Sequence, residues 1–155
     1  MKPLSLIHEF LELNRFALIG VSRNPSDFSR KLFAEFLYRG YDVVPVNPFG
    51  KEMEGFRCFA DIKEVTPPVS AAMVMTGRGV TEQVLRDCAD WGITLVWIFG
   101  ISGEKDVSPG AMAVCRSAGI NVIAGHCPYM FLPRAGLFHR IHGAAWKLAG
   151  LYPES

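Results

Sequence analysis

The chain contains 155 residues, half of them apolar, and its 16 basic and 15 acidic side chains give a formal net charge of +1. This length suits one sizeable core, so we expect a single domain over residues 1–155. The balanced charge excludes a general attraction to nucleic acid or anionic membranes, and no apolar run approaches the roughly twenty residues that cross a bilayer. Glu9 and Glu12 interrupt the first apolar stretch, which argues against a secretory signal. The four scattered cysteines form no CxxC pair, as is typical of reduced thiols in a cytoplasmic protein.

The first part of the chain predicts a strand, a helix and a second strand, after a short leading helix at residues 4–13. Residues 16–20 form an apolar run that stops at Gly20, the pattern of a strand buried on both faces before a tight turn. Residues 28–39 repeat apolar side chains at helical spacing, and Gly40 follows where a left-handed residue ends a helix. Residues 43–46 give the second strand. Such a unit leaves its first turn open at one edge of a parallel sheet.

The helix at residues 28–39 is expected to have one apolar face. Large aliphatic and aromatic side chains form its inner stripe, whereas polar and charged side chains fall largely outside that stripe. The stripe comprises Leu32, Phe33, Phe36 and Leu37, and the outer set comprises Ser29, Arg30, Glu35 and Arg39.

The rest of the chain continues the alternation of strands and helices. Strands are expected at residues 71–75, 94–99 and 121–124, and helices at residues 60–65, 81–91 and 109–118. The alternation predicts an α/β fold, a Rossmann-like doubly wound five-stranded parallel sheet with the strand order 3-2-1-4-5. Residues 134–151 carry apolar side chains at helical spacing and predict a C-terminal helical extension. This extension packs either on the sheet or against a second copy of the chain, so a homodimer remains open.

Small, polar or cationic residues follow every predicted strand. Because parallel strands end at the same edge of a sheet, these residues meet where open α/β sheets bind ligands. A phosphate above the first turn would meet the backbone N–H groups of residues 22–24, the Ser22 hydroxyl and the positive end of the following helix. The set comprises Gly20-Val21-Ser22, Asn47-Pro48, Thr76-Gly77-Arg78-Gly79, Gly100 and Gly125-His126-Cys127.

The first turn does not match a dinucleotide site. A dinucleotide fingerprint requires G-x-G-x-x-G, whereas this turn reads Gly20-Val21-Ser22-Arg23-Asn24-Pro25 and lacks the second glycine. The second strand ends in Asn47-Pro48, without the acidic residue that holds a ribose in nicotinamide sites. Arg23 and Lys51 instead suit an adenosine that carries an additional phosphate, although each also fits a solvated surface charge.

These motifs resemble the CoA-binding domain family, small Rossmann-like proteins similar to the amino-terminal domain of the succinyl-CoA synthetase α subunit. The resemblance covers residues 16–133 and rests on the turn at residues 20–25, the V-P-V-N-P return at residues 44–48 and the late pair Cys127-Pro128. It implies that the chain binds a small-molecule nucleotide, coenzyme A or an acyl-CoA, at the carboxyl edge of its sheet.

The resemblance also implies roles for individual residues. The first turn would lie along the phosphates and adenosine, Asn47-Pro48 and Lys51 would flank the adenine and 3′-phosphate, and residues 77–79 would line the pantetheine or diphosphate path. Family members often carry an arginine directly at the end of the third strand, whereas Thr76-Gly77 precede Arg78 here. The candidate ligand-binding residues are Gly20, Val21, Ser22, Arg23, Asn24, Pro25, Asn47, Pro48, Lys51, Gly77, Arg78, Gly100, Cys127 and Pro128.

No catalytic or metal-binding residue is predicted. Cys127 beside His126 at the ligand edge is the best candidate for thiol chemistry, but direct neighbours in a strand-end loop need not face each other, so His126 is not assigned as the base that activates the thiol. His139 and His142 lack acidic partners for a metal. The synthetase's phosphorylated histidine belongs to a second domain, so neither ligase activity nor that role for His126 is carried over. We therefore expect a non-catalytic CoA-binding module, a sensor or an accessory protein. Two alternatives stay open: an NAD(P)-type enzyme or redox sensor, and a subunit that completes a ligase with a separate chain.

Overall fold

The computed structural model describes residues 2–132, so the extension predicted at residues 134–151 lies outside the described part. The strands are β1 (Arg15–Ile19), β2 (Asp42–Val46), β3 (Glu52–Met53), β4 (Phe56–Arg57), β5 (Ala71–Val74), β6 (Leu95–Phe99) and β7 (Asn121–His126). The helices are α1 (Pro3–Glu12), α2 (Phe28–Tyr38), α3 (Arg78–Asp90) and α4 (Pro109–Ala118), with short 3-10 turns at Ile62–Glu64, Glu104–Asp106 and Pro128–Met130. Within residues 2–132 no helix is both long and apolar enough to cross a membrane.

Five strands form one parallel sheet in the order β2-β1-β5-β6-β7. The predicted α/β class with a Rossmann-like five-stranded parallel sheet is confirmed. Counted over the five predicted strands, however, the order is 2-1-3-4-5, so the predicted order 3-2-1-4-5 is wrong. The strand order reverses between β1 and β5, where Ile19 pairs with both Val46 and Val74.

The strand β2 lies at the edge of this sheet because the chain beyond it covers its outer side. Phe59 donates its N–H to the carbonyl of Pro45 at 3.0 Å, and Asn47 donates its N–H to the carbonyl of Phe59 at 2.9 Å. The carbonyl of Pro45 therefore faces outward, away from β1. The N–H that proline lacks would also have faced outward, so its absence removes no hydrogen bond between β1 and β2. Pro45 is the sequence signal for an edge strand that the predicted order overlooked.

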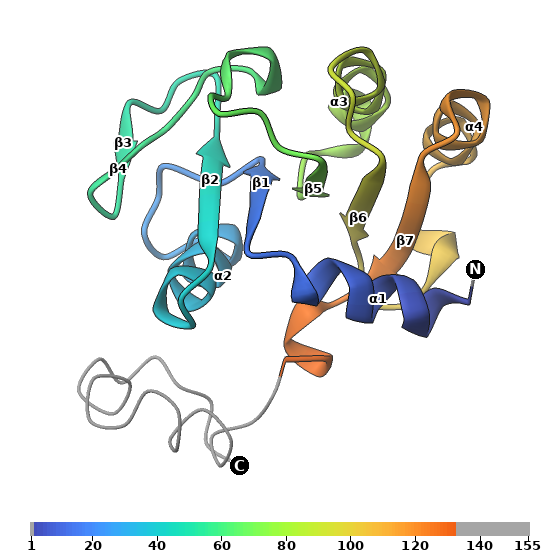
Figure 1. Cartoon of the computed structure of the whole chain (residues 1–155), viewed down its shortest axis with the longest axis horizontal. Helices are drawn as coiled ribbons and strands as arrows, with labels where there is room; N and C mark the ends of the chain where they lie inside the picture. Colours follow the sequence, from blue (N-terminus) through green and yellow to red (C-terminus); the bar gives the residue numbers. More distant parts are fainter. Residues whose placement is uncertain (1, 133–155) are drawn as a thin grey trace.

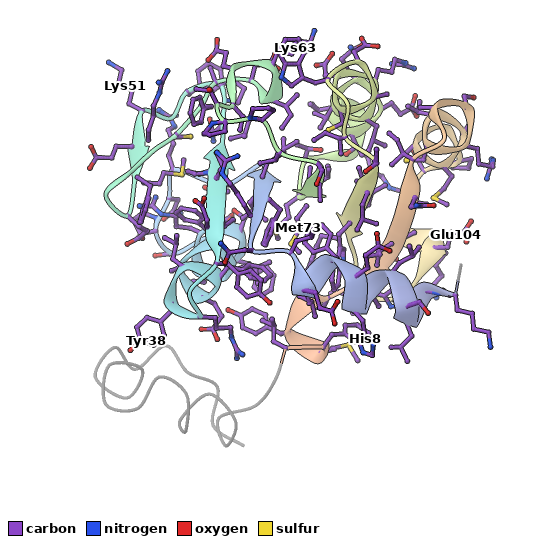
Figure 2. The ribbon with its side chains drawn as sticks, viewed as in Figure 1. His8, Tyr38, Lys51, Lys63, Met73 and Glu104 are labelled. Carbon is purple, nitrogen blue, oxygen red and sulfur yellow. The ribbon has the colours of Figure 1, made fainter. Side chains whose placement is uncertain are left out.

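Alternate side chains of the strands enter two cores, one on each face of the sheet. In β1, Phe16 and Leu18 point to one face while Ala17 and Ile19 point to the other, and all four are buried. Helices α3 and α4 cover one face, and α1 and α2 cover the opposite face (Figure 1). Figure 2 shows Met73 of β5 enclosed among the side chains of the interior. The sheet is thus covered on both faces, which leaves its edges for a ligand.

The helix ends largely follow the predicted pattern. The carboxylate of Asp27 caps α2 by accepting the N–H of Ser29 at 2.8 Å, and α2 ends before Gly40, whose φ is +89°. The helix α3 begins at Arg78, three residues before its predicted start. The helix predicted at residues 60–65 is a single 3-10 turn, and the preceding loop folds as the unpredicted hairpin β3–β4.

Two polar residues of α2 and its C-cap residue Arg39 correct the predicted helix face. Ser29, Glu35 and Arg39 fall outside the apolar stripe in the sequence, yet they are 4%, 1% and 3% exposed. Arg39 donates from Nε to Oε1 of Glu35 at 2.7 Å. Burial raises the pKa of the Glu35 carboxyl, and the hydrogen bond and charge of Arg39 oppose that rise. Each residue of the pair provides the partner that lets the other be buried.

This ion pair predicts a large effect on stability. Arg39→Ala should lower the free energy of unfolding by about 3–5 kcal/mol, because it leaves the Glu35 carboxyl buried without its ion-pair partner. Arg86→Ala is the matched control, since it removes the cation of the exposed pair with Glu82 at the same helical spacing. This control should cost about 1 kcal/mol or less. Urea unfolding measures both losses, and equal values would contradict the role of burial.

Candidate functional site

Two adjoining pockets open at the carboxyl edge of the sheet. Both are lined by Gly20 and Thr76, which follow β1 and β5 at the point where the strand order reverses. The larger pocket, of ≈330 Å³, extends toward β6 and the start of α4, and the smaller, of ≈210 Å³, extends toward β2. Because open α/β sheets bind ligands at such a reversal, this crevice is the candidate functional site.

The two pockets differ in chemistry. The larger pocket has polar groups at the starts of three helices and two aromatic rings, Phe28 and Phe99, whose centroids are 5.3 Å apart. The walls of the smaller pocket are mainly apolar. The larger pocket includes Ser22, Asp27, Arg78, Thr81, Asp106 and Ser108, and the smaller includes Val46, Pro48, Asp61, Ile62, Val80 and Val84. The crevice therefore offers a mainly apolar compartment at one end and a more polar one at the other.

Gly20 permits the two strand ends to meet. Its φ of +96° lies in the left-handed region, and a Cβ at this position would be 2.8 Å from the carbonyl carbon of Met75. A side chain would therefore strain the turn and also collide with the backbone that follows β5. Packing against the backbone that follows β5 is therefore one reason for a glycine at position 20.

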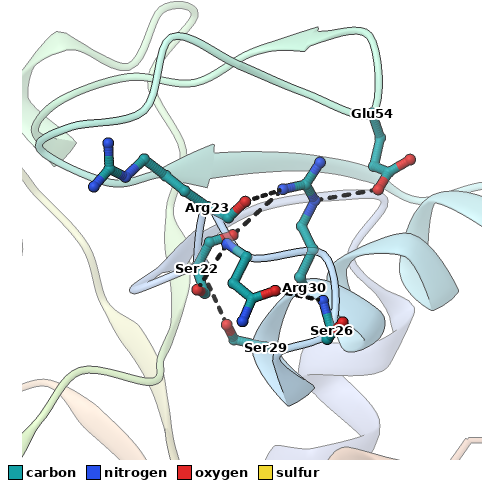
Figure 3. Close-up of polar contacts among 7 residues, drawn as sticks. Ser22, Arg23, Ser26, Ser29, Arg30 and Glu54 are labelled. Atoms are coloured by element: carbon teal, nitrogen blue, oxygen red, sulfur yellow. Dashed lines mark hydrogen bonds and ion pairs between the residues drawn. The ribbon is translucent and has the colours of Figure 1, made fainter.

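The turn after Gly20 satisfies most of its own hydrogen-bonding groups. Ser22 donates its N–H to Oγ of Ser29 at 2.9 Å, and Asn24 donates its N–H to Oγ of Ser22 at 3.0 Å (Figure 3). The expectation that the N–H groups of residues 22–24 are all available to a phosphate is therefore wrong for two of the three in this structure. Sequence reasoning missed the first contact because the acceptor Ser29 lies seven residues further on, whereas the second is made within the turn itself by Ser22.

Asp27 adds a negative charge that the sequence analysis did not assign to the site. Its carboxylate lines the larger pocket and accepts the N–H and Oγ–H of Ser29 at 2.8 and 2.6 Å. As the N-cap of α2 it partly offsets the positive end of that helix. An anion beside α2 must therefore draw its attraction from the backbone of the turn and from Arg23 more than from the helix end.

Asn47 joins the loops after β1 and β2. Its Nδ2 donates to the carbonyl of Val21 at 2.8 Å, and its Oδ1 accepts the N–H of Phe49 at 2.8 Å. Its amide is thus occupied within the protein, where it holds the two loops together. The neighbouring Pro48 lines the smaller pocket, whereas Lys51 lines neither pocket and lies at the periphery (Figure 2).

Arg23 and Phe49 form an exposed pair beside the crevice. The guanidinium carbon of Arg23 lies 5.6 Å from the centre of the Phe49 ring, and Phe49 is 75% exposed. A cation on the loop after β1 thus lies over an aromatic ring on the loop after β2, and these are the two loops that Asn47 connects. The sequence pattern did not single out Phe49, since an aromatic residue in a loop has no periodicity to mark it.

Arg78, the first residue of α3, points toward the loop after β6. Its Nη2 lies 3.3 Å from the carbonyl of Asp106 and 3.4 Å from that of Lys105. At the start of the same helix, the hydroxyls of Thr76 and Thr81 are 2.8 Å apart. The structure therefore places Arg78 and Thr76, both expected at this edge of the sheet, in the wall of the larger pocket, and it adds Thr81 to them. Gly77 is the N-cap residue of α3 and lines neither pocket.

The loop after β6 is fixed by one carboxylate. Oδ2 of Asp106 accepts the N–H groups of Ile101 and Ser102 at 2.8 and 2.7 Å. These two hydrogen bonds lower the pKa of Asp106, and nearby Lys105 and Arg78 lower it further. The carboxylate is therefore held in its ionised form at the wall of the larger pocket.

Gly100 has a packing role that its prediction as a ligand residue did not include. A Cβ on Gly100 would lie 2.6 Å from the Cα of Gly125, and a Cβ on Gly125 would lie 1.7 Å from the carbonyl oxygen of Gly103. Gly103 also donates its N–H to the carbonyl of Gly125 at 2.9 Å. The three glycines let this loop close onto the end of β7.

Cys127 and Pro128 line neither of the two pockets. The 3-10 turn that begins at Pro128 packs with the core beneath α1 and α2, and the carbonyl of His126 accepts Nε1–H of Trp97 at 2.9 Å. Two other cysteines are buried in α3 and α4, and burial raises the pKa of Cys88 to about 12 and that of Cys115 to about 11. These two thiols therefore stay protonated at neutral pH. Within residues 2–132 no cluster of three metal-ligating side chains is present.

Comparison with known proteins places this site in a family. The model of the CoA binding domain matches residues 14–133, which is most of the chain. The chain therefore belongs to the CoA-binding domain family, and the resemblance drawn from its motifs is confirmed.

Two relatives come from Pyrococcus furiosus. The chain is 26% identical to acetate–CoA ligase (ADP-forming) II subunit alpha over 129 residues, which cover 79% of this chain and 28% of that protein. It is 27% identical to the subunit alpha of ligase I over 119 residues, which cover 69% and 26% of the two chains. The chain thus spans about a quarter of the length of these relatives.

Solved structures share the fold. A hypothetical protein from Pyrococcus horikoshii OT3 gives a TM-score of 0.72 at 20% identity and covers 84% of this chain and 89% of its own. The dinucleotide forming acetyl-coenzyme A synthetase 1 of Ca. Korarchaeum cryptofilum, in complex with phosphate and ADP, gives 0.67 at 19% identity over 77% and 27% of the chains. At these identities the likeness supports the fold.

The glycine contact beside the larger pocket gives a testable prediction. Gly125→Ala should lower the melting temperature far more than Gly119→Ala. Both glycines have positive φ, +77° and +69°, so the backbone strain is similar, but only at position 125 would the new Cβ overlap another backbone segment. Scanning calorimetry measures the two shifts. Equal shifts would mean that the loop after β6 does not approach β7 so closely.

Proposed function

We propose that this protein binds coenzyme A, free or as an acyl-CoA, in the crevice at the carboxyl edge of its sheet. The observation that carries the proposal is the junction of the two pockets at Gly20, in a chain that belongs to the CoA-binding domain family. Coenzyme A is long and chemically divided, with an adenine ring, phosphates and a pantetheine arm. A crevice with two different compartments and a glycine turn between them suits such a molecule.

The smaller pocket suits the adenine ring, because apolar side chains such as Pro48, Ile62 and Val84 line it. The diphosphate would cross the turn at Gly20 and Ser22. The pantetheine arm would then enter the larger pocket. Arg23 is exposed on the same turn and, with Lys51 further out, would meet the 3′-phosphate at the rim.

The NAD(P) alternative has less support. The turn still lacks the second glycine of a dinucleotide fingerprint, and β2 ends at Asn47, whose amide is occupied by Val21 and Phe49. An amide already bonded at both ends is poorly placed to hold the ribose hydroxyls of a nicotinamide dinucleotide.

We infer a binding role and not a catalytic one. Among the described residues, the two crevice hydroxyls that contact a carboxylate, Ser29 with Asp27 and Ser108 with Glu82, also accept backbone N–H groups and belong to the starts of α2 and α4. Cys127 lines neither pocket. The Pyrococcus relatives are ligase subunits about four times as long as the matched part, so any group transfer would require residues outside that part or a separate chain. A cytoplasmic sensor or accessory module that holds CoA or acyl-CoA fits these observations. A homodimer stays a prediction.

Ligand-induced stabilisation tests the proposed ligand. Coenzyme A at about a hundred times its dissociation constant should stabilise the protein by roughly 2.7 kcal/mol and raise the melting temperature by several degrees. Dephospho-CoA should give a smaller shift and NAD none. Differential scanning fluorimetry with the three ligands in parallel provides the comparison. A shift with NAD and none with coenzyme A would replace this proposal with the dinucleotide alternative.

Charge reversal on the turn tests the placement of the 3′-phosphate. Arg23→Glu should weaken coenzyme A binding by about tenfold or more, because it replaces one charge-assisted contact with repulsion. Arg116→Glu, in the last turn of α4, makes the same change in net charge at a residue that lines neither pocket of the crevice and should leave affinity within about twofold. Titration calorimetry with coenzyme A and dephospho-CoA measures the effect. An equal loss for both ligands would place Arg23 away from the 3′-phosphate.

A further inference from the structure

Arg30 lies behind the first turn and reaches two segments at once. Its Nε forms an ion pair with Oε1 of Glu54 at 3.1 Å, on the turn of the hairpin β3–β4. Its Nη1 lies 3.2 Å from the carbonyl oxygen of Arg23 and 3.5 Å, near the limit of a hydrogen bond, from that of Ser22 (Figure 3). The side chain of Arg30 is 13% exposed and that of Glu54 is 42% exposed, so the guanidinium is mostly covered while its partner carboxylate stays open to water.

The contacts of Arg30 determine which way the peptide groups of the turn face. In a trans peptide the C=O and N–H bonds point in opposite directions. Carbonyls of Ser22 and Arg23 that face Arg30 therefore turn the N–H groups of Arg23 and Asn24 to the other side. The Ser22 hydroxyl, which accepts the Asn24 N–H, marks that side, and Ser22 lines the larger pocket. Among the described residues the N–H of Arg23 has no hydrogen-bond partner, so it is the donor left for a ligand.

Glu54 adopts an unfavourable backbone conformation at the position from which it reaches Arg30. Its φ is +51°, and it is followed by Gly55 at +81° in the turn between β3 and β4. Hairpin turns of this kind favour asparagine, aspartate or glycine, because other residues carry a steric cost there. Glutamate is therefore an unfavourable residue at this position of the turn. The ion pair with Arg30 is a stabilising interaction that glutamate makes from this position.

We propose that Arg30 is a positioning residue for phosphate recognition, held in place by Glu54 of the hairpin β3–β4. This proposal rests on the proposed function and adds a mechanism to it. Arg30 fixes the peptide between Ser22 and Arg23 so that the Arg23 N–H faces the phosphate. Its own guanidinium lies on the carbonyl side of the turn and is paired with a carboxylate. Arg30 therefore acts through the turn and makes no contact with the ligand.

Binding measurements with ADP and adenosine test this role, because only ADP carries the diphosphate. Arg30→Met keeps most of the side chain's length but removes its donors, and it should weaken ADP and coenzyme A about tenfold while adenosine changes less than about twofold. Arg30→Lys should restore part of the loss. Lys31→Met, at the exposed neighbouring position of α2, is the control and should bind like the native chain. An equal loss for ADP and adenosine would reveal a merely structural role and overturn the proposal.

Glu54→Asn separates stability from affinity. Asparagine suits the left-handed turn but is too short to reach Arg30, so the melting temperature should stay equal or rise while ADP affinity falls several-fold. Unchanged affinity would remove Glu54 from the mechanism. Higher affinity would mean that the released guanidinium contacts phosphate directly, which contradicts a positioning role.

Nuclear magnetic resonance of the ligand-free chain provides a readout that does not depend on the ligand. Arg30→Met should shift the amide resonances of Arg23 and Asn24, whereas Lys31→Met should leave them in place. Unmoved resonances would overturn the proposal. Failure of the native chain to bind either ADP or coenzyme A would instead refute the proposed function, so the two failures can be told apart.

Discussion

The close approach of two backbones at Gly20 is the constraint on which the ligand edge depends. The turn after β1 presses against the backbone after β5, with no room for a Cβ, and both pockets meet at this contact. The contact exists because β1 and β5 are neighbours in the sheet. The segment around Phe59 covers the outer side of β2, so the next strand of the sheet, β5, pairs with β1 instead. The path of the chain after β2 therefore decides where the crevice lies. A sheet in the predicted order would have separated these two strand ends.

The alternation of strands and helices could be predicted because the strands of the parallel sheet are mainly apolar on both faces and each helix has one apolar stripe, and both patterns follow directly from burial. The strand order could not be predicted from those patterns, which are the same for a central and an edge strand. Only Pro45 distinguishes them, through its missing N–H. The buried pair of Glu35 and Arg39 was missed for a related reason. A charged residue can be buried when an oppositely charged partner lies one helical turn away. A prediction that places every polar residue on the exposed face of a helix misses such a pair.

The candidate site was predicted in outline and corrected in its contacts. Gly20, Ser22 and Arg78 were predicted for the carboxyl edge and line its pockets, because position at a strand end follows from topology. What each residue contacts there depends on partners distant in sequence. Asn47 reaches across to Val21, Arg30 reaches the hairpin, and Gly100 packs on Gly125. Several residues that a motif assigns to a ligand thus shape the loops around it, while contact with the ligand itself is left to fewer groups.

A crystal structure of the full chain with coenzyme A would test the central claim most directly. The account predicts the adenine ring in the smaller pocket beside Pro48 and Val84, the diphosphate over the turn at Gly20, and the pantetheine arm in the larger pocket between α2 and α4. Electron density for coenzyme A away from the carboxyl edge of the sheet would contradict the account. So would a complex in which the turn at Gly20 makes no contact with the phosphates.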